Sequence, residues 1–164
     1  MKEKEIYLAG GCFWGVEEFF SRIDGVLETS AGYADGLQPI TTYQDIKKTD
    51  HSETVYIKYD ADKISLEKLL DYFFMIIDPT SVNRQGNDIG RQYRTAIYYS
   101  DESDIKTIQK RIQLEQTKYS KPIVTEVKKI NNFCRAEEYH QKYLKKNPGG
   151  YCHVDMSLLD KIKS

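Results

Sequence analysis

The chain has few cysteines, little net charge and no long apolar run, and each shortage excludes a class of protein. Three cysteines in 164 residues, Cys12, Cys134 and Cys152, are too few and too scattered for a disulfide framework. Lys plus Arg number 24 and Asp plus Glu 25, so a net charge of -1 gives no electrostatic case for binding nucleic acid or an anionic membrane. No apolar run approaches the roughly 20 residues that span a bilayer, and residues 1–5 are no signal peptide. The length suits one sizeable core, so we expect a single cytoplasmic domain over residues 1–164.

The spacing of apolar residues predicts an α+β fold. Strands are expected at 5–9, 26–31, 53–59, 95–99 and 123–130, and helices at 13–24, 66–77, 101–119 and 137–146. The order β-α-β-β-α-β through residue 99 indicates a ferredoxin-like core sheet with helices on it. A C-terminal helix and an irregular tail complete the prediction. Two long loops, 32–50 and 80–94, are the first places to look for functional residues, because long loops inside a compact domain are usually functional.

Cys12 lies between a predicted strand and a predicted helix, where a thiolate is stabilised. Phe13 and Val16 have helical spacing, so the cysteine is expected at or beside the first turn. Free amide N–H groups and the helix dipole favour negative charge there. Gly10 and Gly11 allow the backbone to turn tightly and leave one side of the sulfur open. We therefore interpret Cys12 as a nucleophile with a thiolate favoured over the thiol.

A series of short motifs resembles the peptide methionine sulfoxide reductase A family. The series comprises Gly11-Cys12-Phe13-Trp14-Gly15, Gly32-Tyr33, Thr42-Tyr43, His51-Ser52-Glu53, Asp78-Pro79-Thr80, Arg84-Gln85-Gly86-Asn87-Asp88, Gln92-Tyr93-Arg94, Ala136-Glu137-Glu138-Tyr139-His140-Gln141 and Asn147-Pro148-Gly149-Gly150-Tyr151. The motifs occur in order and cover nearly the whole chain. The resemblance implies an enzyme that reduces the S epimer of methionine sulfoxide, free or in proteins, as a repair of oxidative damage.

Reducing a sulfoxide requires a nucleophile at sulfur, an acid at the departing oxygen and a pocket for the methyl group. Attack by Cys12 would release methionine and leave a cysteine sulfenic acid. The resemblance assigns the acid role to Glu53, which suits it if a dry pocket raises the pKa of the carboxyl group. Read without the resemblance, Glu53 is a solvated carboxylate at the start of a strand.

The remaining site residues come from the resemblance. Tyr43 and Tyr93, one in each long loop, would hold the sulfoxide oxygen through their hydroxyl groups, and Asp88 would help to position substrate and water. Phe13 and Trp14 would form the apolar wall around the S-methyl group, since sulfur packs favourably against aromatic rings. Taken alone, a tyrosine is more often a packing residue and Asp88 a turn former.

Recycling is expected to use a second cysteine and an external thiol. The resemblance places a resolving cysteine near Cys152, so a transient Cys12–Cys152 disulfide reduced by thioredoxin or a similar dithiol is implied. Gly149 and Gly150 supply backbone freedom for the approach. Cys134 has no match in the family motifs and is read as structural. No paired spacing of metal ligands is present, so we expect no metal site. We also expect no cofactor and a monomeric protein.

Two positions depart from the family pattern. Asp35 stands where a second glycine usually follows Gly32-Tyr33, and Asp50 stands where a glycine commonly precedes His51. Both are expected at the pocket rim. The chain also ends at Ser164 without the further resolving cysteine of many relatives, which predicts a single recycling disulfide.

Two other functions remain open on the sequence alone. A cysteine hydrolase would use Cys12 as nucleophile and His140 or His51 as base, but it would give Cys152 no role. A non-catalytic module that binds peptides on its aromatic surface would keep its function in a Cys12→Ala variant. Consumption of a dithiol with methionine sulfoxide, against cleavage of an ester or amide, distinguishes the reductase from the hydrolase.

Overall fold

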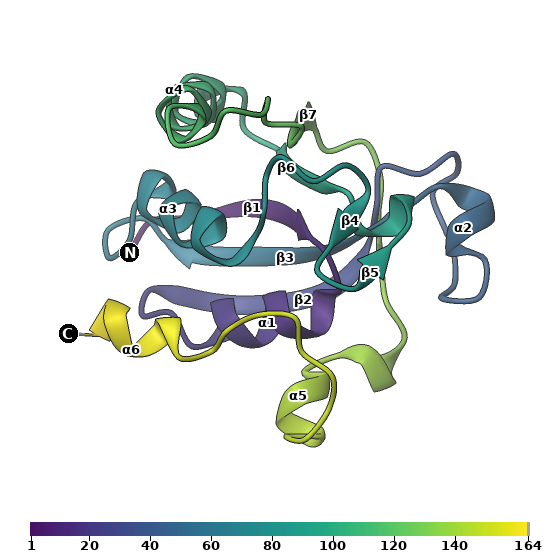
Figure 1. Ribbon diagram of the computed structural model, residues 1–164. Coiled ribbons are helices and arrows are strands. Elements are labelled where there is room, and N and C mark those ends of the chain that lie inside the picture. Colours follow the sequence, from purple (N-terminus) through teal and green to yellow (C-terminus); the bar gives the residue numbers. More distant parts are fainter. Residues whose placement is uncertain (164) are drawn as a thin grey trace.

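A six-stranded sheet forms the centre of the computed structural model, which describes residues 1–163 (Figure 1). Its strands are β1 (Glu3–Gly10), β2 (Val26–Ala34), β3 (Ser52–Asp60), β6 (Thr95–Tyr99), β7 (Glu126–Lys129) and β8 (Phe133–Arg135). The spatial order is β7-β6-β1-β3-β2-β8, with β6 and β7 parallel and the other neighbours antiparallel. The predicted α+β class is confirmed.

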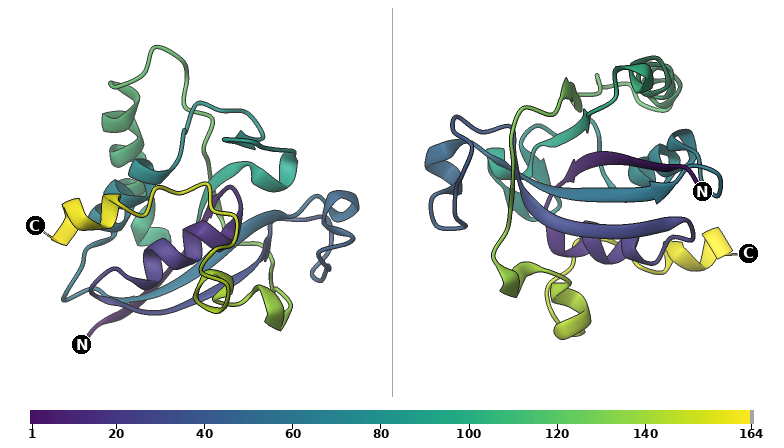
Figure 2. Two further views of the ribbon diagram at one scale, coloured as in Figure 1. Left: turned by 60° about the horizontal axis from the view of Figure 1, so that its bottom comes forward. Right: turned by 180° about the vertical axis from the view of Figure 1, so that it is seen from behind.

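Two helices cover one face of this sheet and enclose the main core. Helices α1 (Phe13–Ser21) and α3 (Leu66–Ile76) lie along the sheet, and α4 (Ile105–Gln116) packs on α3 (Figures 1 and 2). Ser65 caps α3, because its side chain accepts a hydrogen bond from the backbone N–H of Lys68. The buried core brings together Ile6, Leu8, Val16, Phe19, Phe20, Val55, Ile57, Leu69, Leu70 and Phe73. This core fixes α1, and with it Cys12, against the ends of β1 and β3.

Both long loops contain short elements that the sequence pattern did not predict. The first loop holds α2 (Ile46–Thr49). The second holds the hairpin of β4 (Arg84–Gln85) and β5 (Asp88–Ile89), followed by the 3-10 helix η1 (Arg91–Tyr93). The hairpin and η1 bring the second loop to the same end of the sheet as the start of α1 (Figure 1).

The helix predicted over 137–146 is wrong as one continuous element. A 3-10 turn, η3 (Glu138–His140), is separated from α5 (Tyr143–Lys146), and Lys142 between them has a φ of 50°. The helix is interrupted because Gln141, between η3 and α5, bonds to strand β2. The side-chain amide of Gln141 accepts a hydrogen bond from Ala31 N–H at 2.9 Å and donates one to Ala31 C=O at 2.8 Å. It thereby satisfies backbone groups of β2 just beyond the point where β8 stops pairing.

The C-terminal tail runs across α1 before it ends in α6 (Leu158–Lys163), a helix that the sequence pattern did not predict (Figures 1 and 2). Val154 and Leu159 of this segment join the main core, so the tail is packed onto the domain. Over residues 1–163, the helices are all too short or too polar to cross a membrane.

Candidate active site

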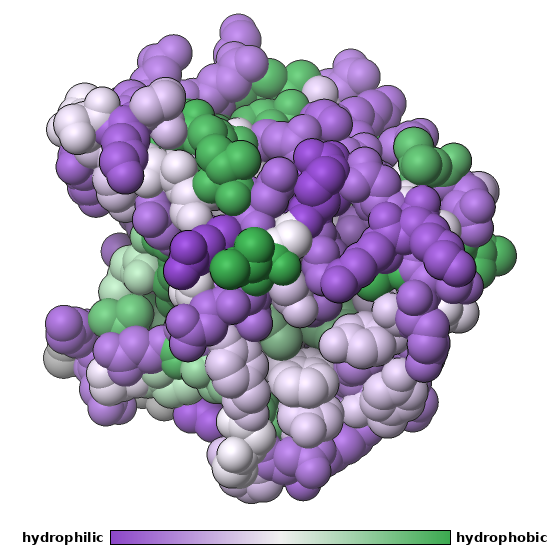
Figure 3. All heavy atoms as spheres, turned by 45° about the vertical axis from the view of Figure 1, so that its right-hand side comes forward, coloured by the Kyte–Doolittle hydropathy of each residue, from purple (hydrophilic) through white to green (hydrophobic). Residues whose placement is uncertain are grey.

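Residues from both long loops, α1 and β3 enclose a cavity of about 180 Å³ beside Cys12. Its lining residues are Cys12, Phe13, Trp14, Tyr43, Glu53, Asp88, Tyr93 and Tyr151. The structure therefore brings together seven of the predicted site residues and adds Tyr151. Figure 3 views the side of the molecule that carries α2 and β5, where pale side chains of intermediate hydropathy gather in the lower half. Green apolar side chains lie around them, some singly and some in small groups.

Cys12 occupies the N-cap position of α1, as the sequence predicts. Gly11 before it has a φ of 89°, a left-handed conformation that glycine adopts without strain. The sulfur is buried, and burial followed by the nearby Glu53 raises the pKa of the Cys12 thiol well above its usual range. The backbone N–H of Trp14 lowers the pKa but does not outweigh these two effects. The expected resting thiolate is therefore wrong: the helix start supplies a donor, but the dry pocket keeps the proton on sulfur.

Glu53 lies on β3 with its side chain only 2% exposed. The backbone N–H of Phe13 donates to Glu53 Oε1 at 3.1 Å, which joins the carboxyl group to the first turn of α1. Burial raises the pKa of Glu53 to about 8, and the neighbouring Asp88 acts in the same direction. The Phe13 hydrogen bond lowers the pKa by less. At neutral pH the group is therefore a protonated carboxylic acid beside the thiol, rather than a solvated carboxylate.

Three phenol groups surround this acid and thiol. Tyr43 is 40% exposed, and its backbone N–H donates to Glu137 Oε2 at 3.0 Å, which fixes the first loop. Tyr93 ends η1, and burial followed by Glu53 raises its pKa, so its hydroxyl group keeps its proton. Tyr151 donates to Asp88 Oδ2 at 3.0 Å. The sequence singled out Tyr151 only as part of a motif, because its position in a tail gives no sign that the tail folds back over the pocket.

His140 supports the aromatic wall from behind. Trp14 Nε1–H donates to His140 Nδ1 at 3.0 Å, and the Trp14 ring stacks on Tyr143 with centroids 3.7 Å apart. The His140 ring also contacts Phe13 and Tyr43, at centroid distances of 5.1 and 4.8 Å. Burial lowers the pKa of His140, which keeps the ring neutral and Nδ1 free to accept. The imidazole therefore orients the indole instead of facing the cavity.

Cys134 and Cys152 both lie outside the cavity lining. Cys152 lies in the tail beside the first turn of α1, and its S–H group points to Val154 C=O at 3.3 Å. Cys134 lies in β8 opposite Tyr33 of β2, with its sulfur 3.7 Å from Thr41 C=O. All three cysteines are free thiols.

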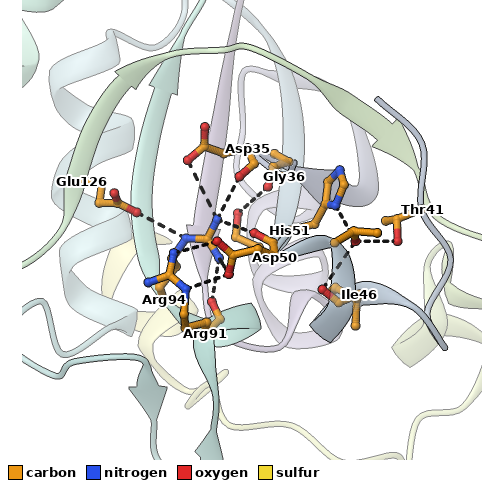
Figure 4. Close-up of polar contacts among 12 residues, drawn as sticks. Asp35, Gly36, Thr41, Ile46, Asp50, His51, Arg91, Arg94 and Glu126 are labelled. Atoms are coloured by element: carbon orange, nitrogen blue, oxygen red, sulfur yellow. Dashed lines mark hydrogen bonds and ion pairs between the residues drawn. The ribbon is translucent and has the colours of Figure 1, made fainter. Parts of the chain in front are cut away.

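The sequence suggested that Asp35 and Asp50 lie at the pocket rim, but neither lines the pocket. Both instead bind a buried arginine, Arg94, behind it (Figure 4). Both have left-handed backbones, with φ of 55° and 60°, so the family glycines at these positions have a conformational reason. Arg94, 4% exposed, donates to the carbonyl groups of Asp35 at 3.1 Å and Asp50 at 2.9 Å. Asp50 also pairs with Arg91 at 2.7 Å, and Asp35 with Lys128 at 3.0 Å.

The arginine cluster consists of Asp35, Asp50, Arg91, Arg94, Glu126 and Lys128. Arg94 directly follows Tyr93, and Asp50 stands three residues before Glu53. By joining the end of β2, the start of β3 and η1, the cluster fixes the backbone that carries two cavity residues. It is a structural support for the site.

The geometry disfavours the hydrolase alternative. His140 Nδ1 is occupied by Trp14, and His51 is fully buried with Nδ1 2.7 Å from Thr49 Oγ1. Neither imidazole is among the residues that line the cavity around Cys12. Within residues 1–163, no three or more His, Cys, Asp or Glu side chains are grouped so that they could hold a metal ion.

Comparison with known proteins agrees with this site. The sequence matches the family described as "Peptide methionine sulfoxide reductase" over residues 4–163. It is 59% identical over 155 residues to the peptide methionine sulfoxide reductase MsrA of Clostridium botulinum strain Hall, covering 93% of this chain and 99% of that protein.

Two solved structures of a yeast relative match the fold. Mxr1 from Saccharomyces cerevisiae in reduced form has a TM-score of 0.89 and 38% identity, over 94% of this chain and 92% of that one. Mxr1 in complex with Trx2 has a TM-score of 0.64 and 30% identity, over 87% and 85% of the two chains. This chain therefore belongs to the peptide methionine sulfoxide reductase A family and is an enzyme that reduces methionine sulfoxide.

Proposed function

We propose that the cavity beside Cys12 binds the S epimer of methionine sulfoxide, free or in proteins, and reduces it to methionine. The observation that carries this proposal is the placement of a buried thiol and a neutral carboxylic acid, Cys12 and Glu53, in one small aromatic cavity. Such a pair supplies both a nucleophile for sulfur and a proton for oxygen. The cavity volume of about 180 Å³ suits a methyl sulfoxide group rather than a large ligand.

In the proposed first step, Cys12 Sγ attacks the sulfoxide sulfur. Glu53 donates its proton to the oxygen, and the hydroxyl groups of Tyr43 and Tyr93 hold that oxygen as hydrogen-bond donors. The attack forms a bond between Cys12 Sγ and the substrate sulfur. The protonated oxygen then moves to Sγ, the substrate S–O bond and the Sγ–S bond break, and methionine departs, leaving Cys12 as a sulfenic acid. The proton that Cys12 loses returns to Glu53, so the site is neutral before and after the step. Phe13 and Trp14 enclose the methyl group, and Asp88 positions Tyr151 and substrate.

In the proposed second step, Cys152 attacks the Cys12 sulfenic acid, a disulfide forms and water leaves. A dithiol protein such as thioredoxin then reduces the disulfide and supplies the two electrons that the sulfoxide consumed. The structure of Mxr1 with Trx2 supports such a partner for this chain. We propose that no bound cofactor is needed.

We further propose that residues 1–164 act as one monomeric catalytic domain in the cytoplasm, where the enzyme repairs methionine residues oxidised under stress. Reducing conditions suit its three free thiols. We also infer a ferredoxin-like core, which the order β6-β1-β3-β2 of its four antiparallel strands supports.

Turnover of the two resolved epimers tests the function, because each epimer has its own enzyme class. We expect the enzyme to convert peptide-bound methionine S-sulfoxide in the presence of a dithiol and to leave the R epimer unchanged. Cys12→Ser should abolish the reaction, since an alcohol is a far weaker nucleophile at neutral pH. Equal use of both epimers, or substantial activity in the variant, would contradict the proposal.

A further inference from the structure

Gly15 is a buried glycine in the first turn of α1, three residues after Cys12. Glycine inside a helix costs roughly 1 kcal/mol relative to alanine. Its backbone is helical, unlike that of Gly11, so no left-handed conformation requires a glycine there. The position must therefore serve a neighbour that needs the space.

That neighbour is the tail that crosses α1 (Figure 2). A Cβ atom at Gly15 would lie 3.0 Å from Cys152 Sγ and 3.0 Å from Val154 Cγ2. Both distances are tighter than ordinary van der Waals contact between these atoms. The missing side chain thus opens a seat in which the Cys152 sulfur rests directly on the helix that begins at Cys12.

The tail is anchored on both sides of this seat. On one side, Tyr151 donates to Asp88 Oδ2 at 3.0 Å. On the other, His153 Nε2 lies 2.9 Å from Gly10 C=O, in hydrogen-bonding contact with the strand that leads to Cys12. The Cys152 sulfur is therefore held at the start of α1 before any substrate is turned over.

We propose that Gly15 is a positioning residue for the recycling step: it seats the Cys152 sulfur within short reach of Cys12. The proposal rests on the proposed function. When Cys12 becomes a sulfenic acid, Cys152 Sγ attacks its sulfur, the S–S bond forms and the S–O bond breaks. The oxygen leaves as water with the proton of the Cys152 thiol, and no further oxidant is required. A Cβ at position 15 would displace Cys152 and Val154 and slow this attack, whereas Tyr151, which lines the cavity, keeps its hydrogen bond to Asp88.

Gly15→Ala tests the proposal in single-turnover reactions with excess methionine S-sulfoxide and no added thiol. Two quantities are followed, methionine release and formation of the Cys12–Cys152 disulfide. We expect methionine release within about twofold of the wild type and disulfide formation slowed at least tenfold. Dimedone should trap the Cys12 sulfenic acid in the variant. Disulfide formation at the wild-type rate would overturn the proposal.

Two further variants separate positioning from misfolding. In a Cys152→Ser background, which cannot form the disulfide, Gly15→Ala should leave methionine release unchanged although it still displaces Val154; an added loss of methionine release would contradict the proposal. His153→Ala leaves α1 intact and should also slow disulfide formation. If Gly15→Ala does not fold, formation of the disulfide at the wild-type rate in His153→Ala would overturn the proposal that the anchored tail positions Cys152.

The wild type itself distinguishes this proposal from the proposed function. If it releases methionine but peptide mapping finds no Cys12–Cys152 bridge, the recycling route is wrong. If the Cys12–Cys152 disulfide forms equally fast in the wild type and in Gly15→Ala, only the positioning role of Gly15 is wrong.

Discussion

Two carboxyl groups near the start of β3 have opposite environments although they are only three positions apart in the sequence. Asp50 forms a hydrogen bond with Arg91 and lies near Arg94, and the Arg91 contact lowers its pKa. Glu53 is buried beside Cys12 with a single backbone donor, and burial raises its pKa to about 8. One group is a carboxylate at neutral pH and the other is an acid.

The difference has two causes, since burial raises the pKa of Glu53 and neighbouring cations lower the pKa of Asp50. Arg91, Arg94 and Lys128 are gathered in the arginine cluster behind the pocket, whereas the eight cavity-lining residues of the described chain include no lysine or arginine. A cation in the cavity would stabilise the ionised form of Glu53 and remove its proton. The fold therefore separates a charged support from an uncharged reaction site. Three substitutions test whether the arginine cluster and the reaction site have these separate roles.

Removal of Arg94, the central cation of the arginine cluster, should have the largest effect of the three substitutions. Arg94→Met leaves the carbonyl groups of Asp35 and Asp50 without their donor and the acidic side chains with less positive charge. We expect the free energy of unfolding to fall by about 3 kcal/mol or more, the scale for breaking a buried charged network. Denaturant unfolding measures this loss. A change below about 1 kcal/mol would show that the arginine cluster is not a structural support.

Removal of the acid should act on chemistry instead of folding. Glu53→Gln keeps the shape but cannot donate the proton, so the single-turnover rate should fall by ~10²-fold or more. The wild-type rate should fall as pH rises through about 8, where Glu53 loses its proton, and the variant should lack this limb.

The matched control is Glu115→Gln in α4, since Glu115 is also 2% exposed but is paired with Arg111 outside the cavity. Its single-turnover rate should equal that of the wild type. If Glu53→Gln also reacted at the wild-type rate from pH 5 to 9, the acid role would be refuted.

Removal of Arg91, the exposed cation of the arginine cluster, should have the smallest effect of the three substitutions. Arg91→Ala removes the pair with Asp50, but the Arg91 side chain is 55% exposed and solvent screens the contact. We expect unfolding to become easier by about 0.2–1 kcal/mol, with an unchanged single-turnover rate. Thermal unfolding at low and high salt measures it, and a loss above 2 kcal/mol would place Arg91 in the buried part of the cluster.

The sequence predicted local features of the fold better than contacts between distant segments. The strand before Cys12, the helix after it and the Ser65 cap follow from patterns within a few residues. The break at Gln141 does not, because its cause is a pair of hydrogen bonds to Ala31 in another strand. α6 was missed for a related reason, since it is short and follows an irregular tail.

The site shows the same limit. Motifs located the cavity residues, but the direction of the Cys12 pKa could not be read from its helix-start position, because burial depends on the whole pocket. Tyr151 and His140 form hydrogen bonds with Asp88 and Trp14, which are distant from them in sequence. Asp35 and Asp50 were noticed as departures, yet only the fold reveals that their common partner is Arg94.

The most direct test of the account is a titration of both carboxyl groups in one sample. Carbon-13 NMR of the enzyme with labelled aspartate and glutamate side chains, assigned with Glu53→Gln and Asp50→Asn, reports each ionisation separately. We expect Glu53 to titrate near pH 8 and Asp50 to titrate below the ordinary value of about 3.9. A Glu53 carboxyl group that ionises at pH 4 to 5 would contradict the central claim, because no proton would then be available for the sulfoxide oxygen at neutral pH.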